Sequence, residues 1–130
     1  MSIIALIDDD SDIIQATSMM LEAKGYDVVT ATNVKDGYNL ILNVKPELII
    51  LDVMMDEPDD GFYLALKLRK NNIQTPIIML TSVSKALGME FGTGATNPVD
   101  EFLEKPIPPS VLLEKVKFQL TKSEENNVSI

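Results

Sequence analysis

Three stretches of the chain are apolar at every position, and such runs are typical of strands buried on both faces of a sheet. They span residues 3–7, 48–51 and 77–80. Residues 26–31 and 99–103 mix apolar with polar side chains, which suits strands at the edges of a sheet. The pattern therefore predicts five strands, with the three wholly apolar ones at the centre.

Between the strands, apolar residues recur at the spacing of amphipathic helices. The predicted helices span residues 11–24, 34–45, 61–70 and 109–121. Gly25 is placed to end the first helix, and Asn33 is placed to cap the second. On the buried face of the third helix we expect four side chains, namely Phe62, Ala65, Leu66 and Leu68.

Strands that alternate with helices predict an α/β fold with a doubly wound parallel sheet. Placing the mixed strands at the edges gives the strand order 2-1-3-4-5, the flavodoxin-like order. The segment 84–98 contains three glycines and a proline, so it predicts an irregular or shortened fourth helix. Residues 1–121 form one predicted domain, and the polar residues 122–130 are expected to be a flexible tail.

Charge and composition narrow the possible partners and cofactors. The 130 residues include 20 acidic and 11 basic side chains, and the net charge of −9 argues against nucleic acid and anionic membrane partners. With no cysteine and no histidine, a bound metal would be a hard ion with oxygen ligands, namely Mg²⁺, Mn²⁺ or Ca²⁺. The apolar run at residues 3–7 is too short for a signal peptide or a membrane span, so we expect a cytoplasmic protein.

Polar side chains gather where the predicted strands end. Asp8 and Asp9 follow the first strand, Asp52 the third, Thr81 the fourth and Lys105 the fifth. The carboxyl ends of parallel strands meet at one edge of the sheet, where α/β proteins bind ligands. Crowded carboxylates repel one another unless a cation joins them, and Mg²⁺ takes carboxylates, waters and phosphate oxygens. A carboxylate in such a site can accept a phosphoryl group and form an acyl phosphate.

Four motifs surround these polar side chains, in order along the chain. They are Ile7-Asp8-Asp9-Asp10, Leu51-Asp52-Val53-Met54-Met55, Met79-Leu80-Thr81-Ser82 and Phe102-Leu103-Glu104-Lys105-Pro106. At these spacings they resemble the receiver domain of bacterial two-component response regulators. The resemblance extends from Ile3 to about Leu120.

The resemblance implies a role for each acid of the cluster. It implies that Asp52 is the phosphoacceptor. It also implies that Mg²⁺ is ligated directly by Asp9, Asp52 and the carbonyl of Met54, while Asp8 holds the metal through water.

The resemblance further implies a switch, in which Lys105 pairs with the phosphoryl oxygens, Thr81 moves to hydrogen-bond them and Phe102 turns inward in step. A sensor histidine kinase or a phosphotransfer protein would supply the phosphoryl group, because this chain has no histidine. Since the chain ends after the last helix, we expect a stand-alone receiver that changes its surface for an unidentified output protein. It would not be an enzyme beyond its own phosphorylation and dephosphorylation.

Other interpretations of the same residues are open. One of Asp8, Asp9 and Asp10 could serve only to cap the following helix. A pseudo-receiver, which keeps the fold as an interaction module without being phosphorylated, is favoured by the irregular segment 84–98 and by the acidic loop after Asp52. A Mg²⁺-dependent phosphatase that forms an aspartyl phosphate is less favoured, because no insertion is long enough to cover the site.

Overall fold

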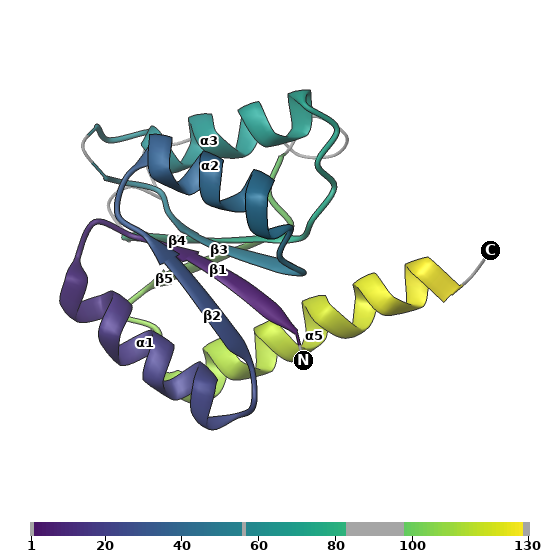
Figure 1. The fold of residues 1–130 in the computed structure, drawn as a ribbon. Coiled ribbons are helices and arrows are strands. Elements are labelled where there is room, and N and C mark those ends of the chain that lie inside the picture. Colours follow the sequence, from purple (N-terminus) through teal and green to yellow (C-terminus); the bar gives the residue numbers. More distant parts are fainter. Residues whose placement is uncertain (1, 56, 83–97, 129–130) are drawn as a thin grey trace.

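The computed structural model describes residues 2–55, 57–82 and 98–128, and it shows helices on both faces of one sheet (Figure 1). The five parallel strands are β1 (Ile3–Ile7), β2 (Asp27–Ala31), β3 (Leu48–Asp52), β4 (Ile77–Ser82) and β5 (Glu101–Lys105). Their order in the sheet is β2-β1-β3-β4-β5. The predicted fold class and strand order are confirmed.

In the described part of the chain, two helices cover each face of the sheet. These are α1 (Ser11–Ala23) and α5 (Pro109–Val128) on one face, and α2 (Val34–Val44) and α3 (Asp60–Lys70) on the other (Figure 1). Among these residues, no helix is both long enough and apolar enough to cross a membrane.

Alternate residues of the central strands face the two layers of helices. Ala5 and Ile7 of β1 belong to the core cluster beneath α2 and α3, whereas Ile4 and Leu6 belong to the cluster beneath α1 and α5. All five residues of β3 are buried, because this strand is covered on both faces. The backbone that carries Asp52 is therefore fixed by two hydrophobic cores.

Local signals set the ends of α1 and α2. The side-chain oxygen of Asn33 accepts a hydrogen bond from the backbone N–H of Asp36 at 2.8 Å and caps α2. Gly25 follows α1 with a φ of +92°, a region that glycine adopts without strain. The predicted cap of α2 and the predicted end of α1 are confirmed.

The strand β5 begins two residues later than predicted, at Glu101 instead of residue 99. The residue before it, Asp100, uses its side chain: the carboxylate accepts a hydrogen bond from the backbone N–H of Ile77 at 2.8 Å. The ladder with β4 then runs from Glu101 to Lys105. The predicted fifth strand, residues 99–103, therefore lies in the correct part of the chain, but both of its ends are wrong by two residues.

The buried face of α3 also differs from the prediction. Leu64 is fully buried, whereas Leu66, which was expected on that face, is 39% exposed. The helical repeat of 3.6 residues places Leu64 on the same side as Ala65 and Leu68, and places Leu66 on the opposite side.

The last helix ends later than predicted. It was expected to end at residue 121, but the backbone is helical as far as Val128. The flexibility expected of residues 122–130 stays a prediction. Residues 123–127 contain neither glycine nor proline, so the local sequence does not interrupt the helix. The predicted irregular or shortened fourth helix over residues 84–98 lies, except for Pro98, outside the described residues.

Near the end of α3, one arginine ties three chain segments together. The guanidinium of Arg69 donates four hydrogen bonds, to the backbone carbonyls of Ile73 at 2.8 Å, Thr75 at 2.8 Å and Pro98 at 3.0 Å, and to the carboxylate of Asp100 at 2.8 Å. These partners belong to the loop before β4 and to the residues before β5. Arg69 thus joins α3 to the starts of two neighbouring strands.

Candidate functional site

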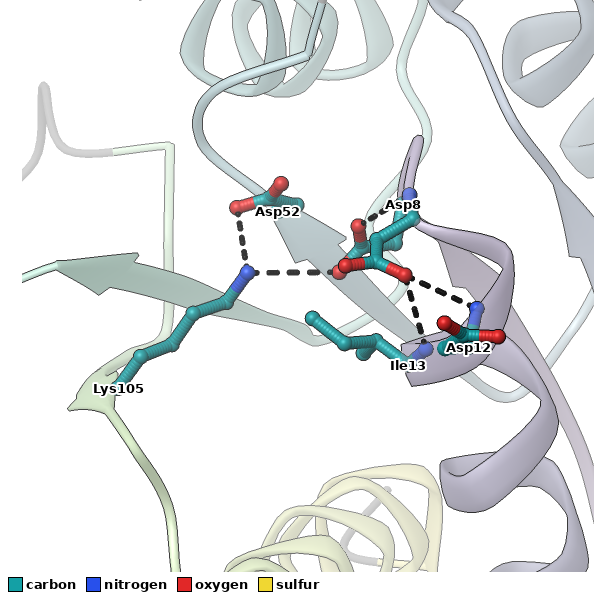
Figure 2. A network of polar contacts seen from close by, with 6 residues as sticks. Asp8, Asp12, Ile13, Asp52 and Lys105 are labelled. Carbon is teal, nitrogen blue, oxygen red and sulfur yellow. Dashed lines mark hydrogen bonds and ion pairs between the residues drawn. The ribbon is translucent and has the colours of Figure 1, made fainter.

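The carboxyl ends of the strands bring Asp8, Asp52 and Lys105 together, as the sequence predicted (Figure 2). The Nζ atom of Lys105 donates to Oδ1 of Asp52 at 3.1 Å and to Oδ2 of Asp8 at 3.5 Å. The peptide bond between Lys105 and Pro106 is cis. The ammonium of Lys105 bridges two carboxylates from different strands, since Asp8 directly follows β1 and Asp52 is the last residue of β3.

Asp9 completes a cluster of three carboxylates. Asp8, Asp9 and Asp52 each offer one carboxylate oxygen, and these three atoms lie within 4.8 Å of one another. Asp8 has no exposed surface and Asp52 is 6% exposed, whereas Asp9 is exposed. The cluster thus presents hard oxygen donors, the ligand type that Mg²⁺ takes, and it reaches solvent at Asp9.

The acids of the cluster carry more charge than the lysine neutralises. Burial raises the pKa of Asp52, the charge of Asp8 raises it further and Lys105 lowers it, so that the pKa moves from 3.8 to about 6. Burial lowers the pKa of Lys105, but attraction to Asp52 and Asp8 outweighs burial, and the pKa of Lys105 is raised. Lys105 therefore stays protonated at neutral pH, and a divalent cation fits the negative charge that remains.

The three consecutive aspartates have different environments. Oδ1 of Asp10 caps α1 by accepting hydrogen bonds from the backbone N–H groups of Asp12 at 2.9 Å and Ile13 at 3.3 Å. The backbone N–H of Asp10 donates to Oδ1 of Asp8 at 2.9 Å. Capping therefore accounts for Asp10 alone and leaves Asp8 and Asp9 to the cluster. An acid directly before a helical pattern signals the cap, but no sequence signal shows the bond from Asp10 to Asp8.

The two predicted switch residues lie on β4 and β5. Thr81 is 1% exposed and directly follows Leu80, which pairs with Asp52 across β3 and β4. Phe102 pairs in register with Met79 and is half-buried against the core cluster beneath α2 and α3. The fold therefore places Thr81 next to the strand end that carries Asp52, and Phe102 on the neighbouring strand.

The loop after β3 carries the last predicted metal ligand, Met54. A hydrogen bond from the backbone of Met54 to the carboxylate of Asp52 lowers the pKa of that carboxyl. Met54 itself is 42% exposed, and its contact with Asp52 is made by the backbone. Asp56, in the acidic loop that the sequence singled out, lies outside the described residues.

Gly61, in the first turn of α3, lies against the backbone of Asp52. Its N–H donates to the carbonyl of Val53 at 2.9 Å. A Cβ atom added at Gly61 would collide with the carbonyl oxygen of Asp52 and lie 2.8 Å from Cα of Val53. From the sequence, Gly61 was expected only as the start of a helix; its contact with Asp52 depends on how α3 packs on β3.

We expect Gly61→Ala to lower the free energy of unfolding by about 2 kcal/mol, because two backbone segments must move apart to admit the methyl group. Urea denaturation measures this loss. Gly37→Ala is the matched control, since the three atoms nearest to a Cβ there all belong to the side chain of Ile7, which can rearrange. Equal losses in the two variants would show that the backbone of Asp52 is not held by this contact.

Comparison with known proteins agrees with the fold. Residues 4–117 match the family model of the response regulator receiver domain. The alkaline phosphatase synthesis transcriptional regulatory protein PhoP of Bacillus subtilis is 34% identical over 125 residues, which are 93% of this chain and 49% of PhoP. The transcriptional regulatory protein AfsQ1 of Streptomyces coelicolor is 32% identical over 126 residues, which are 94% of this chain and 52% of AfsQ1.

A solved structure of a receiver domain is also similar to this chain. The receiver domain of the Francisella response regulator 1452 superposes with a TM-score of 0.83 at 28% identity, covering 95% of this chain and 99% of that domain. The chain belongs to the response regulator receiver domain family of two-component signalling systems. It spans about half the length of the curated relatives that it matches.

Proposed function

We propose that the protein is a phosphorylation switch in which Asp52 accepts the phosphoryl group. The observation that carries this proposal is the setting of Asp52, a buried carboxylate 3.1 Å from the ammonium of Lys105 and clustered with two further acids. A structural ion pair needs one acid for one lysine. The two additional carboxylates gain a purpose when a metal ion and a phosphoryl group share the site.

In the transfer step, a carboxylate oxygen of Asp52 forms a bond to phosphorus. The bond between phosphorus and a histidine nitrogen of the donor breaks, and its electron pair leaves with that nitrogen. The attacking carboxylate must be ionised, and a pKa of about 6 leaves most of Asp52 ionised at pH 7.5. The ammonium of Lys105 would pair with the negative oxygens of the phosphoryl group, and its distance of 3.1 Å from Oδ1 of Asp52 supports this role.

Asp9, Asp52 and the carbonyl of Met54 would hold Mg²⁺ directly, and Asp8 would act through a water molecule. Three carboxylate oxygens within 4.8 Å of one another support this ligand set, because such donors suit a hard divalent ion. When bound, the ion supplies positive charge against the carboxylates and the phosphoryl oxygens.

The proposed response to phosphorylation begins at Thr81. Its hydroxyl hydrogen-bonds the phosphoryl group, and Phe102 turns into the space that Thr81 leaves. The burial of Thr81 and the half-buried position of Phe102 on the next strand support this coupling. The outcome is a changed surface on β5 and α5 and a changed affinity for an output partner.

The proposed phosphodonor is a sensor histidine kinase or a phosphotransfer protein, since the chain has no histidine. The two curated relatives are named transcriptional regulatory proteins, and each is about twice as long as its matched region. The expectation that this chain has no nucleic-acid partner rests on its net charge of −9 and stays a prediction. The cytoplasmic location also stays a prediction.

Intact-mass spectrometry after incubation with acetyl phosphate and Mg²⁺ tests the proposal. We expect one added phosphoryl group on the wild type, and none when Mg²⁺ is removed or when Asp52 is replaced in Asp52→Asn. The matched control is Asp27→Asn, which removes an exposed carboxylate at the opposite end of the sheet and should leave the labelling unchanged. A small donor makes the result depend on this chain alone.

Two outcomes would contradict the proposal. Absence of any adduct, together with absence of Mg²⁺ binding, would indicate a pseudo-receiver that acts by constitutive binding. Steady turnover of an added phosphate ester, with no lasting adduct, would indicate a phosphatase.

A further inference from the structure

The hydrogen bonds around Asp8 fix the orientation of its carboxylate. Oδ1 accepts the backbone N–H of Asp10 at 2.9 Å, and Oδ2 accepts the ammonium of Lys105 at 3.5 Å. Asp8 has no exposed surface, so these protein donors take the place of water. The two donors come from different parts of the fold, because Asp10 directly precedes α1 and Lys105 is the last residue of β5. Figure 2 shows the ammonium of Lys105 between Asp8 and Asp52.

The backbone N–H of Asp10, which donates to Asp8, is held in position by the side chain of the same residue. Asp10 has the extended backbone of a capping residue, with φ −95° and ψ 109°. Its Oδ1 accepts the N–H groups of Asp12 and Ile13, and its carbonyl accepts the N–H of Ile14 at 3.0 Å. Side chain and main chain thus bind Asp10 to the first turn of α1, and this attachment directs its own N–H to Asp8.

The bond from Asp10 to Asp8 matters because Asp8 is in an unfavourable place for a charge. It is buried, and its negative charge raises the pKa of the neighbouring Asp52. A hydrogen bond from an N–H group to a carboxylate is among the stronger kinds of hydrogen bond. Groups that hold a metal ligand in this way affect metal binding without touching the metal.

We propose that Asp10 is a positioning residue for the metal and phosphoryl site. By capping α1 it holds its own backbone N–H against Asp8, and so it fixes the carboxylate of Asp8 within the cluster. This inference rests on the proposed function, because Asp8 needs a fixed orientation only if the cluster binds a metal ion.

The carboxylate of Asp10 is exposed and also adds a negative charge near the cluster, so the test must separate capping from charge. Asp10→Asn removes the charge and keeps a side-chain oxygen that can cap the helix, whereas Asp10→Ala removes both. Any difference between these two variants is therefore due to the cap. Asn33→Ala, which removes the corresponding cap of α2, controls for a general loss of helix stability.

The experiment is a Mg²⁺ titration of the whole protein followed by NMR, with amide hydrogen exchange at position 10 in the Mg²⁺-free protein. We expect Asp10→Ala to bind Mg²⁺ roughly 10-fold more weakly than Asp10→Asn. The amide at position 10 should also exchange faster in Asp10→Ala than in Asp10→Asn. Asn33→Ala should bind Mg²⁺ like the wild type.

Three results would overturn the inference, and they can be told apart. Equal affinities in the two Asp10 variants would show that only the charge matters and would leave the proposed function intact. An equal loss in Asn33→Ala would show a general effect of helix stability. A wild-type protein that does not bind Mg²⁺ would overturn both this inference and the proposed function.

Discussion

Replacing Asp52 with asparagine should raise the free energy of unfolding of the Mg²⁺-free protein by about 3 kcal/mol at pH 7.5. The pKa of Asp52 is raised from 3.8 to about 6, chiefly by burial and then by the charge of Asp8. Because the folded state raises this pKa, it binds the proton more tightly than the unfolded chain does. The stabilisation by the protonated form is present below about pH 4 and is lost as the pH rises through about 6.

Urea denaturation of the wild type and Asp52→Asn in EDTA, repeated between pH 4 and pH 8, measures this difference. The difference should become small near pH 4, because Asp52 is then neutral in the folded protein and largely protonated in the unfolded chain as well. Asp27→Asn, at an exposed position, should show no such dependence on pH. Lys105 does not change the sign, because its pKa is raised and it stays protonated throughout this range.

Added Mg²⁺ should reduce the difference in free energy of unfolding between the wild type and Asp52→Asn, because it should stabilise the wild type more than the variant. A wild type as stable as Asp52→Asn at pH 7.5 in EDTA would mean that keeping the buried carboxylate of Asp52 ionised beside Asp8 has no energetic cost. The expected result would instead show that the site lowers the stability of the fold, a common consequence of building a reactive site.

Replacing Arg69 with alanine should lower the free energy of unfolding by about 3 kcal/mol. The variant loses four hydrogen bonds and leaves three backbone carbonyls and the carboxylate of Asp100 without this donor. The side chain of Arg69 is 22% exposed, so water can replace part of what is lost. Urea denaturation at neutral pH measures the effect.

Two variants separate the geometry of Arg69 from its charge. Arg69→Lys keeps the charge, but an ammonium has three donors and lacks the planar fork, so it should recover only part of the stability. Lys70→Ala removes an exposed positive charge from the next residue and should have little effect. If Arg69→Ala is no less stable than Lys70→Ala, the hydrogen bonds of Arg69 contribute nothing to the fold.

Asp52→Asn and Arg69→Ala alter opposite ends of the strands. Asp52 lies at the carboxyl end of β3, whereas Arg69 binds residues that precede β4 and β5. Stabilising contacts at one end of the sheet thus support a destabilising cluster of charges at the other.

Much of this arrangement could be predicted from the sequence, because burial leaves a direct trace in the pattern of residues. Strands covered on both faces must be apolar at every position, and the runs that end at Ile7, Leu51 and Leu80 met this condition. The two strands that mix apolar and polar side chains were predicted at the edges of the sheet, and the observed order places β2 and β5 there. Where the pattern was less definite, at the ends of β5 and on the buried face of α3, the predictions were wrong.

The sequence by itself determined which elements form, their order in the sheet and the edge of the sheet at which the acids, Thr81 and Lys105 gather. Only the tertiary structure decided which atoms meet there. Lys105 reaches Asp52 across 53 positions and Asp8 across 97, and Arg69 reaches Asp100 across 31. Such pairs depend on strand register and side-chain direction, which no local pattern of residues encodes. The bond from Asp10 to Asp8 joins near neighbours, yet it too depends on the backbone angles that α1 imposes where it packs on the sheet.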